Sequence, residues 1–173
     1  PITFQSQNVR RARIEGLEAR AELRLARGWT AKLGAAAARG DDLGKAKPLN
    51  SVDPAKVVLG LAWEGVLNAV VPALFSVAPA KAGAQLHLTH VARKSRIDSS
   101  AGVLFPTPAY TVADLTGFIE LGANATLSAG VFNMFDRKHW LWSDVRGAIN
   151  PGASIDRYTQ PGRSVGVRVK YRF

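Results

Sequence analysis

Histidine is the side chain in this sequence best suited to bind a metal ion, and the chain has three: His87, His90 and His139. There is no cysteine, which excludes a disulfide framework, a thiolate metal site and a cysteine nucleophile. His87 and His90 are three residues apart, so in a strand they face opposite sides and cannot converge on one metal. We therefore predict no metal site and interpret His87 as a hydrated polar residue.

The third histidine lies in a segment rich in aromatic and charged residues, from Lys138 to Arg146. Imidazole binds iron and indole stacks on flat aromatic rings, so His139, Trp140 and Trp142 are candidate ligand contacts. The alternative, which we favour, places the three side chains in a belt of aromatic residues at a membrane interface. In that position they would anchor the chain rather than bind a ligand.

Asp144 and Arg146 continue the same segment. A guanidinium group pairs well with a carboxylate, so we expect the two to form an ion pair that shapes a long loop. The alternative is contact with a ligand or a partner, which keeps both among the ligand-contact candidates. The sequence contains no nucleophile elbow, phosphate-binding loop or paired-carboxylate spacing, so we predict no catalytic residues and no enzyme activity.

These residues must be positioned by strands, because apolar and polar residues alternate along most of the chain. The alternation is clearest from Arg13 to Arg27, where Leu17 and Leu23 share one face and Arg20 lies on the other. Ala, Glu, Leu and Arg also favour helices, but a helix here would carry charge on all sides, so a strand is the better interpretation. Six further strands are predicted at residues 29–37, 57–63, 84–93, 110–120, 123–135 and 163–173.

The connections between the predicted strands are of two kinds. Short turns occur near Gly28 and Gly122, whereas long polar loops occupy residues 39–54, 94–108 and 136–162. Strands of about ten residues joined alternately by short turns and long loops are typical of an outer-membrane β-barrel. The apolar face of each strand would then contact lipid, and the polar face would line a wet lumen.

The charge balance is strongly basic, with 23 Lys and Arg residues against 13 Asp and Glu and a formal net charge of +10. Many basic residues alternate with apolar ones, which favours a lumen lining or contact with acidic lipid headgroups. A soluble basic β domain that binds nucleic acid is the alternative, although no face interleaves aromatics with Lys or Arg. The chain has no apolar run of about 20 residues, so we expect no membrane-spanning helix.

One segment departs from this pattern. Residues 66–80, VLNAVVPALFSVAPA, fall where a short turn is expected, yet the segment is long and apolar. It is too short for a spanning helix and contains Pro72 and Pro79. We interpret it as an atypical insertion.

Several motifs resemble the barrels of TonB-dependent outer-membrane receptors. One strand of these receptors is similar to residues 8–19, NVRRARIEGLEA. A loop and the strand after it are similar to residues 48–61, PLNSVDPAKVVLGL. Their penultimate strand is similar to residues 130–140, GVFNMFDRKHW. Within that superfamily, WLWSDVRG at 140–147 and YTQPGRS at 158–164 resemble the haem and haemoglobin receptor group.

The last predicted strand, RSVGVRVKYRF, ends on an aromatic residue and resembles the terminal signal that such barrels present to the barrel-assembly machinery. An ordinary amphipathic strand at the end of a domain is the alternative. The residues that would carry the signal are Val165, Val167, Val169, Tyr171 and Phe173.

The resemblance implies that residues 1–173 are the C-terminal part of an all-β, antiparallel transmembrane barrel in a Gram-negative outer membrane, with about seven of some 22 strands. The plug that meets the TonB complex would lie upstream, as would the haem-contacting histidines, so no ligand residue is carried over from the family. Haem would be a transported ligand rather than a covalently bound cofactor, and haem or a haem protein the partner. A siderophore receptor of the same architecture is the alternative.

Overall fold

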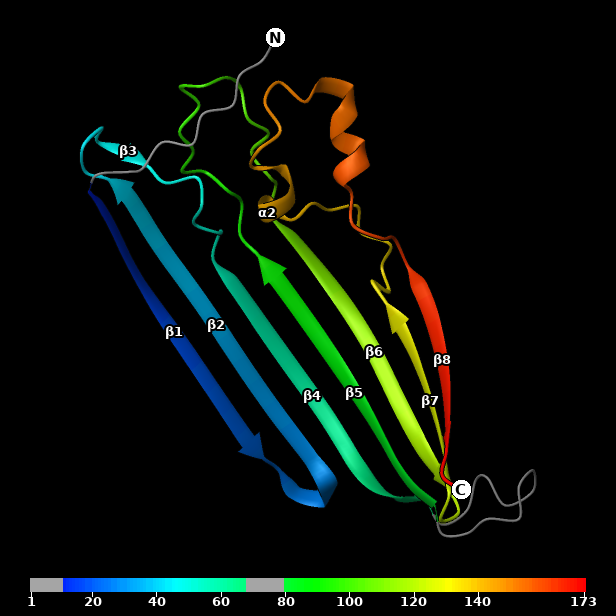
Figure 1. Cartoon of the computed structure of the whole chain (residues 1–173). Coiled ribbons are helices and arrows are strands. Elements are labelled where there is room, and N and C mark those ends of the chain that lie inside the picture. The colour runs from blue at the N-terminus through cyan, green and yellow to red at the C-terminus, as the bar shows by residue number, and fades with distance from the viewer. Residues whose placement is uncertain (1–10, 68–79) are drawn as a thin grey trace.

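The computed structural model describes residues 11–67 and 80–173. Its strands form one sheet in which each long strand pairs antiparallel with the next along the chain, and the two-residue β3 pairs with the outer end of β2 (Figure 1). The strands are β1 (Ala12–Arg24), β2 (Trp29–Asp42), β3 (Lys47–Pro48), β4 (Lys56–Leu67), β5 (Ala80–Val91), β6 (Tyr110–Leu121), β7 (Ala125–Phe132) and β8 (Ser164–Tyr171). The seven long strands confirm the predicted all-β antiparallel fold.

Three of the predicted strands extend further than the sequence pattern indicates. β4 continues past Trp63 to Leu67 and β5 begins at Ala80 rather than Ala84, because the two strands pair with each other along these residues. β2 continues past Ala37 to Asp42, because β1 pairs with it along its whole length. In each case, backbone pairing with a neighbouring strand extends the strand beyond the residues whose apolar and polar alternation predicted it.

The same pairing accounts for the two ends of the predicted insertion at residues 66–80. Val66 lies opposite Lys81, and Leu67 lies opposite Ala80. Residues 68–79 lie outside the described part of the chain.

The short turns and the long loops lie at opposite ends of the sheet (Figure 1). At the turn between β1 and β2, η1 (Ala26–Gly28) closes with Gly28 at a φ of +82°, where L side chains are strained. A Cβ on Gly28 would also lie 2.0 Å from the carbonyl oxygen of Glu64. Gly122, between β6 and β7, has a φ of +69°, so both predicted glycine turns are confirmed.

Strand register gathers the apolar residues on one face of the sheet. Leu61, Leu86, Leu115, Val131 and Val165 form one continuous row across five strands. Many of the large apolar side chains on this face are exposed, as in Val165 at 72%. Such a surface is costly in water and suits contact with lipid, and the opposite face carries charged residues such as Arg20, Glu22, Lys32, Arg168 and Lys170.

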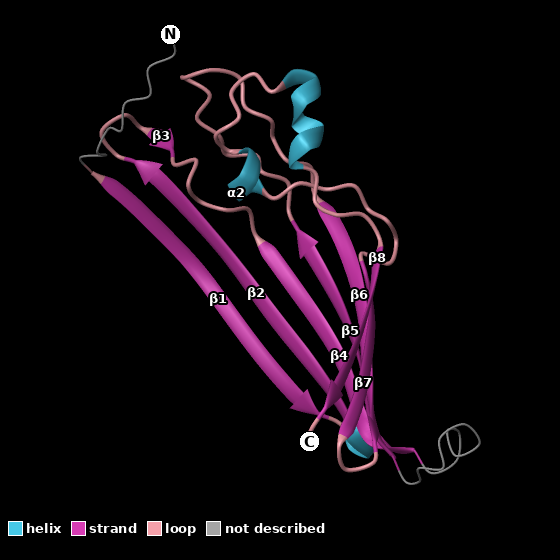
Figure 2. Cartoon of the chain, turned by 45° about the vertical axis from the view of Figure 1, so that its right-hand side comes forward, coloured by secondary structure: helices cyan, strands magenta, loops and turns pink. Residues whose placement is uncertain are grey.

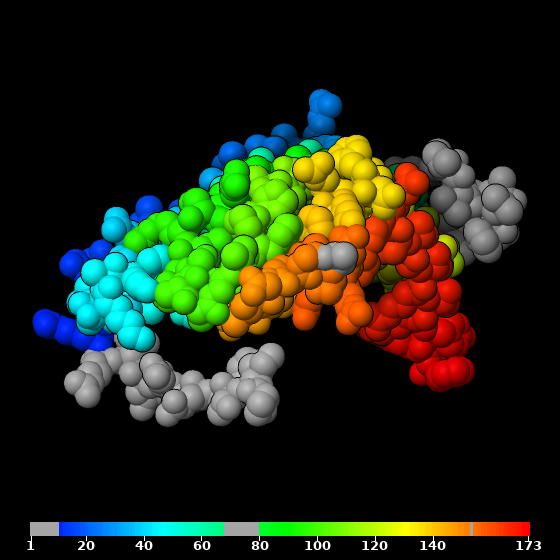
Figure 3. Space-filling model, turned by 90° about the horizontal axis from the view of Figure 1, so that it is seen from above, coloured from blue at the N-terminus to red at the C-terminus, as the bar shows by residue number. Residues whose placement is uncertain are grey.

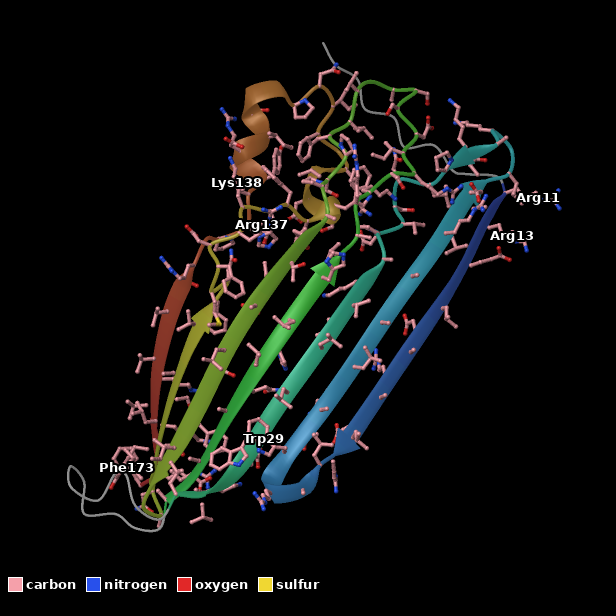
Figure 4. The ribbon with its side chains drawn as sticks, turned by 180° about the vertical axis from the view of Figure 1, so that it is seen from behind. Arg11, Arg13, Trp29, Arg137, Lys138 and Phe173 are labelled. Atoms are coloured by element: carbon pink, nitrogen blue, oxygen red, sulfur yellow. The ribbon has the colours of Figure 1, made fainter. Side chains whose placement is uncertain are left out.

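The apolar band has a definite height along β2. It runs from Trp29 to Ala37, and the next residue on that face is Arg39, which lies opposite Glu15. Nine residues at about 3.3 Å per residue, tilted by about 40°, span about 23 Å, which is close to the height of about 25 Å expected of a lipid-facing band. Trp29, which Figure 4 labels, lies opposite Trp63 at the short-turn end of this band.

The helices of the described residues lie mainly in the long loops, where α2 (Trp142–Val145) and η2 (Gly152–Tyr158) stand above the sheet (Figure 2). Within residues 11–67 and 80–173, none is long and apolar enough to cross a membrane. The buried apolar core also sits at this end, where Leu104, Trp142 and Val145 pack together. The sheet therefore acts as a wall, and the loops form the globular part of the molecule.

Candidate functional site

The three long loops assemble into one body at the outer end of the sheet. We call the loops at residues 43–55, 92–109 and 133–163 the loop cap. Figure 3 shows from above that the three loops lie side by side. Because binding residues are concentrated in loops that a rigid scaffold positions, the loop cap is the candidate functional site.

Trp142 joins all three loops. Its side chain is only 3% exposed, and its indole N–H donates a hydrogen bond to the carbonyl oxygen of Asn50 at 2.7 Å. The ammonium group of Lys94 lies 5.1 Å from the ring centroid and donates to the carbonyl oxygen of Val52. Burial lowers the pKa of Lys94, which the nearby carboxylate of Asp53 partly opposes. A buried cation over an indole thus fixes the centre of the loop cap.

Asn50 and Asp98 are joined by two reciprocal hydrogen bonds. The Asn50 side-chain amide donates to the Asp98 carbonyl oxygen, and the Asp98 N–H donates to the Asn50 side-chain oxygen, each at 2.8 Å. The Asp98 carboxylate accepts from Ser100 and lies 3.5 Å from the Lys47 ammonium group. The bonds from Ser100, with the charge of Lys47, hold the pKa of Asp98 below its usual value. The first two loops are therefore tied by polar contacts as well as by Trp142.

The tips of the second and third loops are also joined. Val103 donates its N–H to the Asn150 side-chain oxygen at 3.1 Å, and its carbonyl oxygen accepts from the Asn150 N–H at 2.7 Å. Leu104 and Ile149 form an isolated antiparallel bridge next to this pair. Val103 is 69% exposed and Ile149 is 44% exposed, so a preorganised apolar tip faces outward.

Asn133 closes the base of the third loop. It is 6% exposed and has a φ of +48°, and its side-chain amide donates to the carbonyl oxygens of Arg137 and Pro161. Asp136 accepts from the N–H of Arg163 at 2.8 Å, so the two ends of the loop are held together. The sequence prediction missed both roles. The signal was present, because Asn and Asp tolerate positive φ and commonly accept backbone N–H groups.

The interpretation of His139, Trp140 and Trp142 as a membrane-interface belt is wrong. His139 is 9% exposed and packs its ring on Tyr110 at 4.5 Å between centroids. Trp140 donates to the carbonyl oxygen of Ile155 at 3.0 Å, within its own loop. The three side chains are drawn into the loop cap because the loop folds over them. The aromatic pair on the apolar face of the sheet is instead Trp29 and Trp63, described above.

The predicted ion pair between Asp144 and Arg146 is also wrong. Both side chains are exposed on the loop cap, but Asp144 accepts from the Gln160 amide at 2.8 Å, and Arg146 donates to the Ser51 carbonyl oxygen at 3.3 Å. Residues two apart on a helix do not face each other, and Asp144 lies within α2 while Arg146 caps it. Of the five candidate contacts, these two have the most accessible side chains.

His87 and His90 lie on opposite faces of β5, as predicted. His87 shares a 2.6 Å contact with the amide nitrogen of Gln85 on the polar face, and His90 lies 2.9 Å from the Thr111 hydroxyl. In residues 11–67 and 80–173, no group of three or more His, Cys, Asp or Glu side chains is arranged to hold a metal ion.

The last strand carries an alternating apolar row. Val165, Val167 and Val169 on β8 are each about 70% exposed, and the rings of Tyr171 and Phe173 meet edge-on with centroids 5.1 Å apart. Figure 4 labels Phe173 at the short-turn end of the sheet. Recognition of this row by the barrel-assembly machinery stays a prediction.

Comparison with known families decides the identity of the fold. The family model "TonB dependent receptor-like, beta-barrel" matches residues 1–134. The chain belongs to this TonB-dependent receptor family. The family is one of transport receptors rather than enzymes, and membership in it overturns the alternative of a soluble nucleic-acid-binding β domain.

Relatives of this TonB-dependent receptor chain include "Probable hemoglobin and hemoglobin-haptoglobin-binding protein 4" of Haemophilus influenzae, 26% identical over 98% of this chain and 18% of the relative. "Hemoglobin-haptoglobin utilization protein B" of Neisseria meningitidis is 27% identical over 75% of this chain and 17% of the relative. The solved structure of "Copper transporter OprC" superposes with a TM-score of 0.73 at 26% identity, covering 94% of this chain and 24% of that structure. The chain thus spans about one fifth of the length of these relatives.

Proposed function

We propose that this chain is part of the wall and outer loops of an outer-membrane receptor that takes up haem from haem proteins. The observation that carries the proposal is the match of almost the whole chain, loops included, to relatives named for binding hemoglobin and hemoglobin-haptoglobin. The resemblance of residues 140–147 and 158–164 to the haem receptor group supports the same ligand, because both motifs lie in the third loop of the loop cap.

In this proposal the loop cap captures the haem protein. It presents a mixed apolar and charged surface of the kind that protein interfaces use. The apolar part is the exposed tip at Val103 and Ile149, and the charged part is the exposed Asp144 and Arg146. Haem then passes along the charged face of the sheet, while an inner-membrane TonB complex acts on the plug, outside this chain. Outer-membrane lipid covers the apolar face, and the barrel-assembly machinery inserts the protein.

Growth of an iron-limited host without iron receptors of its own tests this function. The full-length receptor that contains this chain is expressed, growth is compared on haemoglobin, haemin and a ferric siderophore as iron sources, and uptake of a copper salt is measured separately. We expect growth on haemoglobin and haemin that disappears when TonB is absent. Growth that depends on the receptor only with the siderophore would favour the alternative receptor of the same architecture, and receptor-dependent copper uptake would favour the cargo named for the structural neighbour.

A further inference from the structure

A hollow of about 410 Å³ opens on the charged face of the sheet, away from the loop cap. Its floor consists of glycines where other residues would fill the space with side chains. Gly130 and Gly166 lie opposite each other on β7 and β8, and Gly83 lies on β5. A glycine floor lets another group approach the backbone closely.

Two aromatic rings form walls of this hollow, which we call the glycine hollow. Phe118 lies across Gly83, where an added Cβ would come within 2.5 Å of its ring. Phe132 lies over Gly130, where the corresponding distance to its ring is 3.1 Å. Both rings lie on the face that carries the charged residues, not on the lipid-facing band. The glycine hollow therefore offers aromatic surface where the surroundings are polar.

The charge at the rim is positive. Arg168 lines the glycine hollow from β8, and within the described residues no carboxylate lies at ion-pair distance from it. Glu64 lines the opposite side, but the Lys81 ammonium group lies 3.9 Å from its carboxylate. The rim thus has one guanidinium group available to a carboxylate.

We propose that the glycine hollow binds a flat aromatic ligand that carries carboxylates, a porphyrin, as a station on the barrel wall. The inference rests on the proposed haem uptake and adds a site below the loop cap to it. Phenyl rings stack favourably with a flat aromatic ligand, and a guanidinium group forms paired hydrogen bonds with a carboxylate. The glycine floor lets the rings of Phe118 and Phe132 lie close to the backbone beside the open hollow.

A purely structural role of the glycines makes a different prediction. β7 and β8 curve away from the plane of β1 and β2 (Figure 2), and glycine eases such curvature. Curvature requires small residues on the floor but makes no use of the Arg168 guanidinium group. Removal of the Arg168 charge should therefore impair a binding site but leave the curvature of the sheet unchanged.

The experiment uses the full-length receptor in a haem-requiring host and measures two quantities, haemin bound at the cell surface and haemin accumulated inside. Arg168→Gln removes the charge, and Arg168→Lys keeps it without the paired donors. Lys170→Gln is the matched control, because it removes a cation from the same face of the same strand, outside the glycine hollow. Phe118→Leu keeps Gly83 covered but removes the aromatic ring, and outer-membrane levels are measured for all variants.

We expect Arg168→Gln to lower haemin accumulation about tenfold at limiting haemin, because one charge-assisted bond is lost, with surface binding and receptor level unchanged. Phe118→Leu should lower accumulation as well, which keeps the test decisive if Arg168→Gln assembles poorly. Arg168→Lys should restore part of the uptake. Equal accumulation by Arg168→Gln, Phe118→Leu and Lys170→Gln would overturn the inference. Absence of haemin uptake by the wild-type receptor at normal receptor levels would instead overturn the proposed function, and this inference with it.

Discussion

The indole N–H of Trp142 donates to the carbonyl oxygen of Asn50, which lies 92 residues earlier in the chain. Trp142 is buried in the third loop, and Asn50 in turn holds Asp98 of the second loop through two reciprocal hydrogen bonds. Three loops that are separate in sequence therefore share one network. An opening of any one loop would expose buried polar groups in the others, so the loop cap should open as a unit.

Substitution of Trp142 should loosen loops to which it is not adjacent in sequence. Trp142→Phe removes the donated hydrogen bond, at a cost of about 1 kcal/mol, and Trp142→Ala also empties the cluster around it, at about 3–5 kcal/mol. Amide hydrogen exchange of the full-length receptor should then speed up at residues 43–55 and 92–109. Trp140→Phe is the control for residues 43–55, because that indole N–H donates to Ile155 in its own loop and its ring packs on Phe105 of the second loop. Equal acceleration by both Phe variants would contradict the central role of Trp142.

Acid should weaken the contact between the first two loops. The pKa of Asp98 is lower in the closed loop cap than in an open loop, so its carboxylate stabilises the closed form above about pH 4, its ordinary range. That contribution is lost as the pH falls through the lowered pKa. Ser100 makes the largest contribution to this lowered pKa, so hydrogen exchange at residues 92–109 should rise below pH 4 beyond the intrinsic pH dependence of exchange, with a smaller rise at residues 43–55 through Lys47. Asp98→Asn should be free of this excess, and an identical excess in the variant would argue against Asp98 as the source.

The turn at Gly28 should tolerate no side chain. An alanine there would adopt a positive φ and place its Cβ against the carbonyl oxygen of Glu64 on β4, so we expect a loss of more than about 1 kcal/mol of stability. Gly34→Ala on β2 is the matched control, because a Cβ there meets nothing within 4 Å. Urea unfolding of the receptor in bilayers compares the two. A Gly28→Ala variant as stable as Gly34→Ala would show that the turn adjusts freely.

The wall could be predicted from the sequence far better than the loop cap. Alternation along β1 and β8 and the glycines at residues 28 and 122 are local signals, and a period of two leaves little choice of face. Trp142 is buried against Asn50 and Lys94, which lie 92 and 48 residues earlier in the chain, and His139 packs on Tyr110, 29 residues earlier. Loop residues do not alternate regularly, so their sequence does not indicate such contacts. The aromatic residues near residue 140 therefore looked like an interface belt, whereas the aromatic pair on the apolar face is Trp29 and Trp63, at one end of the alternating strands.

The sidedness of the wall can be tested with two neighbouring residues of β4. Leu59 lies opposite Leu33 near the middle of the apolar band, whereas Val58 faces the charged side of the sheet opposite Gly34. Arginine at the middle of a lipid-facing surface costs about 2–4 kcal/mol, but at a lumen position it can reach water. Leu59→Arg should therefore lower the unfolding free energy in bilayers by about that amount, and Val58→Arg should change it little. Equal costs would mean that the register of β4 is shifted by one residue, because a shift of one exchanges every side chain between lipid and lumen.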